Sequence, residues 1–149
     1  MSCQSLLQQA QHFREVFGQE SLDNISRYGF IKQRLWDMQV NLIKEEVVEF
    51  VEAADECFAD PENQERRLEL IKELSDVVFV CYQFAAAFNL DLDRAMALVF
   101  ESNLSKLDEQ GKPIFREDGK VLKGPNYTPP DLSECVPDVQ LNIYDTHGQ

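Results

Sequence analysis

Residues 31–58, IKQRLWDMQVNLIKEEVVEFVEAADECF, decide the fold. Their apolar residues recur at alternating steps of four and three, which makes one continuous stripe along a helix. The stripe consists of Trp36, Val40, Ile43, Val47, Phe50, Ala54 and Cys57. This stretch is therefore predicted to form one long amphipathic helix. Trp36 is expected to lie in the core because it belongs to this stripe, and Phe13, in another apolar stripe, is expected there for the same reason.

The pair Asp60-Pro61 breaks this helix and predicts the start of the next one. Asp is a favoured N-cap, and Pro is tolerated at the first helical position. The next helix is expected over residues 62–88, and its second half is apolar nearly all round. Such a helix is buried by several neighbours, which can include a second subunit. The short break predicts that the two helices run antiparallel.

Two shorter helices are expected over residues 6–17 and 92–109, the second capped by Asp91 or Asp93. From Gly111 onward, Pro and Gly punctuate a segment without helical period. Its residues 113–116 and 120–122 could pair as a small hairpin, and the last dozen residues are expected to be poorly constrained.

The fold class predicted is all-α, a bundle of four to five helices with an irregular C-terminal tail. At 149 residues the chain is long enough for one ordinary domain. We expect a helical core over residues 1–110 and a Pro/Gly-rich tail over 111–149 that belongs to the same domain.

The formal net charge of −13 disfavours direct binding to nucleic acid, since such binding depends on Lys and Arg that neutralise phosphates. A polyanionic small ligand is still allowed if cations mediate the contact. The sequence contains no long uncharged apolar run, and its first residues lack the pattern of a signal peptide. We therefore expect a cytoplasmic protein that does not enter a membrane.

Histidine and cysteine chemistry is also disfavoured. His12 and His147 lie near opposite ends of the chain, and no C-x-x-C pair is present. The cysteines are expected to be reduced and structural; they are Cys3, Cys57, Cys81 and Cys135. Carboxylates and lysines remain as the candidates for catalysis.

Five carboxylates form two compact patches on the two long predicted helices. At about 100° per residue, Glu45, Glu46 and Glu49 fall within about 100° of arc. Glu73 and Asp76 lie about 60° apart on the next helix. Both patches stand at similar distances from the break between the helices, so antiparallel packing would bring them level.

These carboxylates interrupt apolar stripes, which is unfavourable unless cations neutralise them or protons bind them. Glu46 and Glu49, for example, continue a line formed by Leu35, Met38 and Leu42. A divalent cation resolves this conflict. Mg²⁺ prefers carboxylate and water oxygens and keeps positions open for substrate phosphates, and Mn²⁺ can substitute for it.

Two alternatives compete with a metal site. Any single exposed Glu on a helix is commonplace, so the patches could be an ordinary solvated acidic face. Their matching distances from one turn favour a function instead. A di-iron carboxylate bundle would need Glu-x-x-His on two helices, and these helices contain no His.

The segments Lys44-Glu-Glu-Val-Val-Glu49 and Lys72-Glu-Leu-Ser-Asp76 resemble the E-E-x-x-E and E-x-x-D signature of a known superfamily. This is the MazG-like superfamily of all-α nucleoside triphosphate pyrophosphohydrolases. It includes dimeric dUTPases and phosphoribosyl-ATP pyrophosphohydrolase. The resemblance continues through Glu101-Ser-Asn-Leu-Ser-Lys106 and residues 118–131, so it spans about residues 31–131.

The resemblance implies a bundle of the MazG-like type and hydrolysis of the α-β phosphoanhydride of a nucleoside triphosphate to the monophosphate and pyrophosphate. It implies Mg²⁺ ligands among Glu45, Glu46, Glu49, Glu73 and Asp76. One carboxylate would accept the proton of the attacking water. We assign this role to Glu46, with Glu45 as its competitor, because spacing does not separate a ligand from a base.

Basic and amide side chains after residue 102 are expected to contact the substrate. We interpret Asn103, Lys106, Lys120 and Lys123 as donors to the β- and γ-phosphates, and Tyr127 as a cap on the pocket. Plain solubility is the alternative for the tail lysines.

Two other functions remain open at this point. One is a phosphoribosyl-ATP pyrophosphohydrolase, which shares the acidic core, and the other is a non-catalytic helical dimer that only binds nucleotide. Members of the superfamily are commonly dimers or tetramers, and the apolar surface of residues 62–88 also favours a homo-oligomer.

Overall fold

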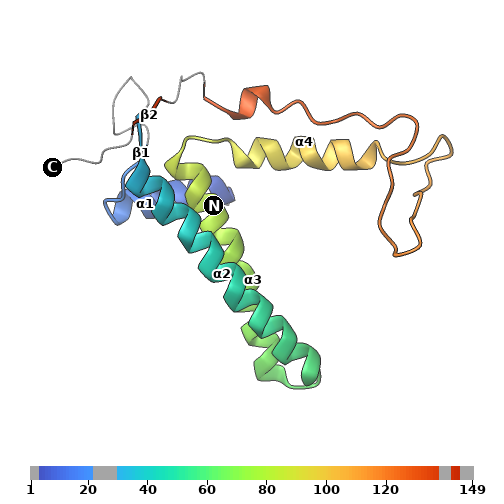
Figure 1. Ribbon diagram of the computed structural model, residues 1–149, viewed down its shortest axis with the longest axis horizontal. Helices are drawn as coiled ribbons and strands as arrows, with labels where there is room; N and C mark the ends of the chain where they lie inside the picture. Colours follow the sequence, from blue (N-terminus) through green and yellow to red (C-terminus); the bar gives the residue numbers. More distant parts are fainter. Residues whose placement is uncertain (1–3, 22–29, 138–141, 145–149) are drawn as a thin grey trace. The chain divides into compact units, whose positions relative to one another are not determined.

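The computed structural model describes residues 4–21, 30–137 and 142–144, and four α-helices lie within them (Figure 1). The helices are α1 (Leu6–Val16), α2 (Gln33–Ala59), α3 (Gln64–Ala87) and α4 (Leu92–Leu104). The remaining elements are the strands β1 (Phe30–Lys32) and β2 (Asn142–Tyr144) and a 3₁₀ helix, Ser133–Cys135. The predicted all-α class is confirmed.

The chain divides into two compact units, Met1–Leu90 with Asp138–Gln149 and Asp91–Pro137. The first unit holds α1, α2 and α3, and the second holds α4 and the segment after it. The expected division into a core over 1–110 and a tail over 111–149 of one domain stays a prediction. None of the helices in the described part of the chain is long and apolar enough to span a membrane.

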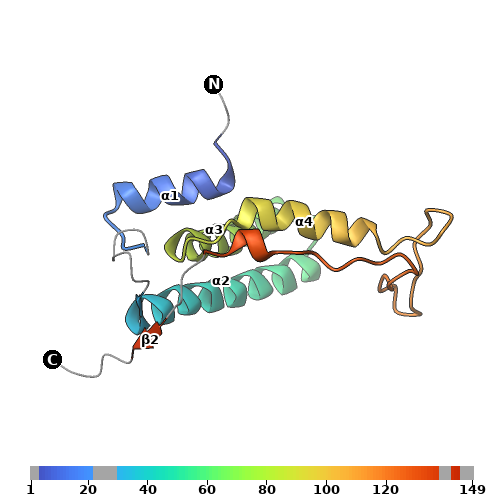
Figure 2. The same cartoon turned by 90° about the horizontal axis from the view of Figure 1, so that it is seen from above.

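Helices α2 and α3 form an antiparallel hairpin and lie side by side in both views (Figures 1 and 2). The prediction that Asp60 caps α3 with Pro61 at its first position is wrong. Asn63 is the cap, and its side-chain oxygen accepts hydrogen bonds from the backbone N–H groups of Glu65 and Arg66 at 3.0 and 3.3 Å. Because these are the second and third N–H groups of the helix, α3 begins at Gln64.

The core of the first unit lies at the open end of the hairpin, where the start of α2 packs against the end of α3. Leu35, Ala87 and Phe88 are buried there, and the ring centroid of Trp36 lies 5.1 and 5.0 Å from those of Phe84 and Phe88. Trp36 therefore packs on the core as expected, although 38% of it is exposed. On the opposite side of α3, the ring of Phe79 meets the Phe13 ring of α1 edge to face.

The expected second helix starts two residues later than predicted, because residues 30–32 form a strand. β1 pairs with β2 in a parallel two-stranded sheet, with Phe30 opposite Asn142 and Lys32 opposite Tyr144. No local pattern signals a pairing between segments so far apart in sequence. Of the last dozen residues, which were expected to be poorly constrained, 142–144 form β2, and the others lie outside the described residues.

The second unit corrects the predicted end of the last helix. The helix α4 begins after Asp91, whose side chain accepts from the Arg94 N–H, but it ends at Leu104 rather than at residue 109. Lys106 therefore lies beyond the helix. The predicted hairpin is confirmed by an antiparallel bridge between Phe115 and Val121.

The cysteines in the described residues are free, as expected. Cys57 and Cys135 are buried, and burial also raises the pKa of the partly buried Cys81 thiol. These thiols are therefore disposed as small structural side chains. Cys3 lies outside the described residues.

Candidate functional site

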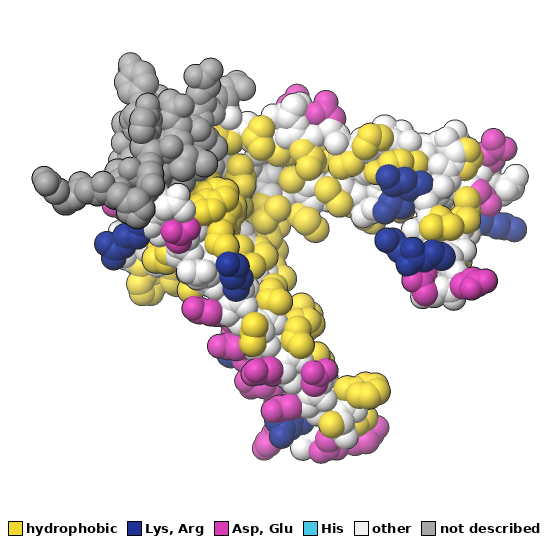
Figure 3. Space-filling model, viewed as in Figure 1, with side chains coloured by type: hydrophobic (Ala, Val, Ile, Leu, Met, Phe, Trp, Pro, Cys, Tyr) yellow, Lys and Arg dark blue, Asp and Glu magenta, His cyan; other side chains and the backbone are white. Residues whose placement is uncertain are grey.

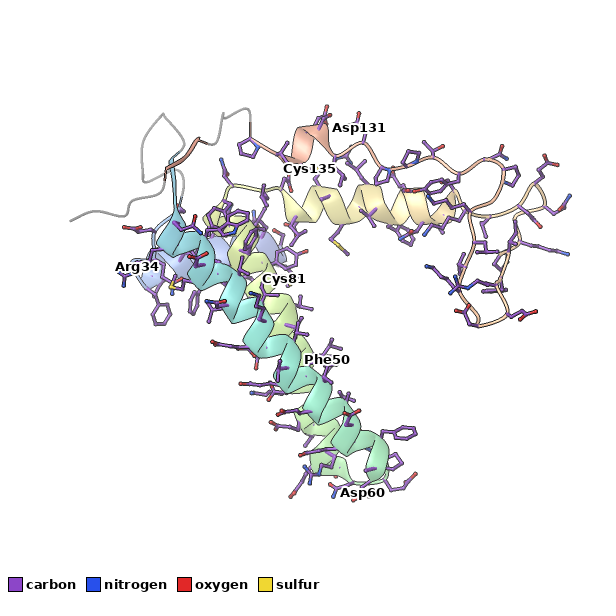
Figure 4. The ribbon with its side chains drawn as sticks, viewed as in Figure 1. Arg34, Phe50, Asp60, Cys81, Asp131 and Cys135 are labelled. Carbon is purple, nitrogen blue, oxygen red and sulfur yellow. The ribbon has the colours of Figure 1, made fainter. Side chains whose placement is uncertain are left out.

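Three carboxylates from two helices converge in the middle of the α2–α3 hairpin. Oxygen atoms of Glu46, Glu49 and Glu73 all lie within 4.8 Å of one another. Glu46 and Glu49 lie one turn apart on α2, and the antiparallel packing brings α3 past them at Glu73. Figure 4 labels Phe50, the neighbour of Glu49, partway along α2, and Asp60 at the tip of the hairpin. The level placement predicted from the sequence is confirmed for these three residues.

Glu73 is the most buried member of this cluster. It is 4% exposed, and its Oε2 atom is buried without a hydrogen-bond partner. A buried anionic oxygen without a donor is costly, and two more carboxylates beside it add to that cost. The arrangement fits a hard divalent cation, which would supply the missing positive charge and accept oxygen ligands from all three residues.

An open cavity of about 360 Å³ adjoins the cluster. Its lining is almost entirely acidic and consists of Glu49, Glu52, Ala53, Glu56, Glu69 and Glu73. Figure 3 shows how Asp and Glu side chains gather along this hairpin. An anionic ligand would enter such a cavity only together with cations.

Lys72 is the cation that the structure itself places at the cluster. Its Nζ atom donates to Oε1 of Glu73 at 2.7 Å and lies 3.2 Å from Oδ2 of Asp76. The hydrogen bond to Glu73 is the main cause of a raised pKa at Lys72, and the contact with Asp76 adds to it. The Lys72–Glu73 hydrogen bond also holds the pKa of Glu73 below its usual value. Lys72 is therefore charged and Glu73 ionised at neutral pH.

Glu46 shows the opposite shift. Burial raises the pKa of Glu46 first, and repulsion from Glu49, Asp76 and Glu73 raises it further, against a smaller effect of Lys72. The pKa of Glu69, one turn before Glu73 on α3, is also raised, and its neighbour Glu73 is the main cause. Glu46 therefore keeps a proton more readily than Glu73 does.

The other two predicted ligands are placed differently. Asp76 is joined to Glu73 through Lys72, whereas Glu45 is exposed on α2 and stands outside the group of three oxygens. The sequence reasoning missed Lys72 as part of the site. The sequence did contain a signal for it: Lys72 precedes Asp76 by four residues, and side chains at this spacing face each other on a helix.

The predicted substrate-binding residues all belong to the second unit. Lys106 Nζ donates to Oδ1 of Asn103 at 2.7 Å, so these two side chains meet although Lys106 lies past the helix end. Lys123 Nζ stands 4.4 Å from the centroid of the Tyr127 ring, as a cation over its face. Lys120 lies in the hairpin, where its N–H binds the Asp118 side chain.

Backbone contacts hold these groups together in ways that the sequence did not reveal. The Gly124 N–H donates to the carbonyl of Lys106 at 2.9 Å, and a Cβ at Gly124 would lie only 2.6 Å from that oxygen. The Thr128 N–H donates to Oγ of Ser105, and the Ser102 hydroxyl donates to the Thr128 carbonyl. The segment that carries Lys123 and Tyr127 is thereby tied to the end of α4.

In a comparison with protein families, residues 10–103 match the model of phosphoribosyl-ATP pyrophosphohydrolase. This range covers more than half of the chain and includes all five predicted carboxylates and Asn103. No curated protein matches the chain in a sequence search. The chain belongs to the phosphoribosyl-ATP pyrophosphohydrolase family of the all-α MazG-like superfamily, whose members are hydrolases that act on phosphoanhydride bonds.

Proposed function

We propose that this protein is a Mg²⁺-dependent pyrophosphohydrolase that cleaves the α-β phosphoanhydride of nucleoside triphosphates. Water would add to the α-phosphorus while the bond to the β-phosphate oxygen breaks, which leaves a nucleoside monophosphate and pyrophosphate. The observation that carries the proposal is the buried, unpartnered Oε2 of Glu73 in a cluster with Glu46 and Glu49. Such a donor set suits a cation that carries phosphates.

Glu46, Glu49 and Glu73 would hold the divalent ion, with Asp76 as a further ligand. When bound, Mg²⁺ supplies charge that neutralises the triphosphate and lowers the pKa of the attacking water. Mn²⁺ accepts the same oxygen ligands and would substitute for it. The role of these residues is to present negatively charged oxygens from two rigid helices at one point.

Glu46 would accept the proton of the attacking water. Its position supports this choice over Glu45, because an oxygen of Glu46 lies within the cluster that would hold the ion. Glu45 is exposed and lies outside the group of three. In the same scheme Asn103, Lys106, Lys120 and Lys123 would donate to the β- and γ-phosphates, and Tyr127 would cap the pocket.

A second candidate substrate is phosphoribosyl-ATP, and the family match over residues 10–103 favours it. It carries the same triphosphate on a larger nucleoside, so the acidic site would serve both substrates equally. Contacts to the base and to its added phosphoribosyl group would then decide between the two substrates.

One experiment tests both candidates. Pyrophosphate and nucleotide products are measured from canonical and modified NTPs and dNTPs and from phosphoribosyl-ATP, with Mg²⁺ and with EDTA. Glu49→Gln is expected to abolish turnover, whereas the control Glu62→Gln, at the exposed turn, keeps it. Turnover that persists in EDTA or in Glu49→Gln would refute the proposal. Nucleotide binding without any turnover would favour a non-catalytic binding protein.

We also infer that the protein forms a homo-oligomer, a dimer or tetramer. An apolar groove of about 360 Å³ runs between α1 and α3, lined by Leu6, Gln9, Ile71, Leu74, Ser75, Val78, Phe79 and Tyr82. Ile71, Leu74 and Val78 are 56%, 41% and 41% exposed at helical spacing. A second copy would present the same apolar face and cover it by two-fold symmetry.

A further inference from the structure

Lys72 bridges two carboxylates that the proposed function assigns to the metal. Its Nζ atom lies 2.7 Å from Oε1 of Glu73 and 3.2 Å from Oδ2 of Asp76. The Lys72 side chain is 57% exposed, whereas that of Glu73 is 6% exposed. The ammonium group thus reaches from solvent to a buried carboxylate, and it can return to water by rotation of its own flexible stem.

The two oxygens of Glu73 have different surroundings. Oε1 accepts the hydrogen bond from Lys72, while Oε2 is buried without a donor. Lys72 therefore neutralises one side of the carboxylate, and the side without a donor remains available to another cation. Glu46 and Glu49 bring two further negative charges next to Glu73. A single ammonium group does not balance these charges.

We propose that Lys72 is an internal counter-cation that competes with divalent ions for Glu73 and Asp76. In the metal-free protein it reduces the repulsion within the acidic cluster and so stabilises the α2–α3 hairpin. A divalent ion that uses Glu73 Oε1 or Asp76 has to displace the ammonium group, which turns to solvent. Lys72 thereby lowers the affinity of the cluster for the ion. This inference rests on the proposed function for the identity of the competing ion.

The test uses the full chain without nucleotide and Mn²⁺ as the probe. Lys72→Met is expected to bind Mn²⁺ several-fold more tightly than the wild type in calorimetric titration, because the competitor is gone. In EDTA the same variant is expected to unfold at a lower temperature, because the carboxylates lose their counter-charge. Lys72→Arg keeps the charge and should stay close to the wild type in both measurements.

Lys44→Met is the matched control. Lys44 is exposed on α2 beside Glu45, and no ion pair involves it in the described part of the chain. Its loss changes the net charge of the protein by the same amount, so it measures the general effect of charge. A loss of stability and a gain in affinity in Lys72→Met beyond those in Lys44→Met support the inference. Equal or weaker Mn²⁺ binding in a folded Lys72→Met overturns it.

Failure of the proposed function has a different signature. If Glu49→Gln binds Mn²⁺ as tightly as the wild type, the metal assignment fails, whereas a tighter binding in Lys72→Met alone would still support competition by Lys72. If neither the wild type nor Lys72→Met binds Mn²⁺, both the metal assignment and the inference are overturned. Should Lys72→Met not fold in EDTA, Lys72→Gln, which keeps a polar head group, is measured in the same way.

Discussion

Glu46 and Glu73 bring carboxylate oxygens from two different helices within 4.8 Å of each other. Their ionisation differs, because burial and repulsion raise the pKa of Glu46 whereas the hydrogen bond from Lys72 lowers that of Glu73. Two acids with divergent pKa values at one point are typical of sites that bind cations and move protons.

The first prediction concerns pH. A carboxyl whose pKa is raised in the folded state favours folding while it is protonated, so its contribution is lost as the pH rises through the folded pKa. In EDTA, Glu46→Gln is therefore expected to melt at a higher temperature than the wild type at neutral pH. The difference should narrow as the pH falls toward the ordinary value of 4.5. Thermal denaturation at several pH values checks this.

The control for that series is Glu52→Gln, on the same helix but outside the group of three oxygens. Its melting temperature is expected to differ less from that of the wild type, and by an amount that changes less with pH. If the melting temperatures of Glu46→Gln and the wild type differ by the same amount at every pH, the raised pKa of Glu46 is contradicted.

A second prediction concerns Gly124. A Cβ there would lie 2.4 Å from the Leu107 carbonyl oxygen and 2.6 Å from that of Lys106. Gly124→Ala is expected to cost about 1–3 kcal/mol in the attachment of the following segment to the end of α4. Faster amide exchange at Tyr127 and Thr128 would report this loosening. Asn126→Ala, at an exposed side chain, should leave the exchange rates unchanged.

The third prediction tests the apolar groove. Val78→Glu places a charge on the exposed apolar face of α3 and should shift the protein to a smaller mass in light scattering after gel filtration. Gln64→Glu, at the exposed first position of α3, adds the same charge away from the groove. It is expected to leave the mass of the protein unchanged. An unchanged mass in Val78→Glu would mean that another surface joins the copies or that none does.

The fourth prediction concerns the start of α3. Asn63→Ala removes the side chain that accepts from two N–H groups of the first turn and should cost about 1 kcal/mol. In a chain of this length that corresponds to a fall of roughly 2–4 °C in the melting temperature. Pro61→Ala, outside the helix, is expected to change it much less. Equal effects of both substitutions would argue against Asn63 as the cap.

The hairpin and its acidic cluster could be predicted because both follow from helical period and one short turn. Once α2 and α3 are antiparallel, the spacing of Glu46, Glu49 and Glu73 brings them level without further information. The Asn63 cap could not be chosen with the same ease, since Asp60 and Asn63 are both favoured cap residues.

Features that depend on distant segments escaped prediction. The end of α4 at Leu104 coincides with two hydrogen bonds to Thr128, which lies 23 or more residues further on. The Ser102 hydroxyl donates to the Thr128 carbonyl, and the Thr128 N–H donates to Oγ of Ser105. The periodicity of the residues after Leu104 continued to indicate a helix, and no local signal opposed it. The strands β1 and β2 are even farther apart in sequence, and their pairing depends on a tertiary contact that no local pattern predicts.

The proposed ligands all lie between residues 46 and 76, a short continuous part of the chain. Lengthening the loop at the tip of the hairpin, near Asp60, would leave the phase of both helices intact, since surface loops absorb insertions. One residue added inside α2 between Phe50 and Cys57 would instead turn Glu46 and Glu49 by about 100° relative to the packed face beyond them. Natural length variation in this hairpin should therefore be confined to its tip.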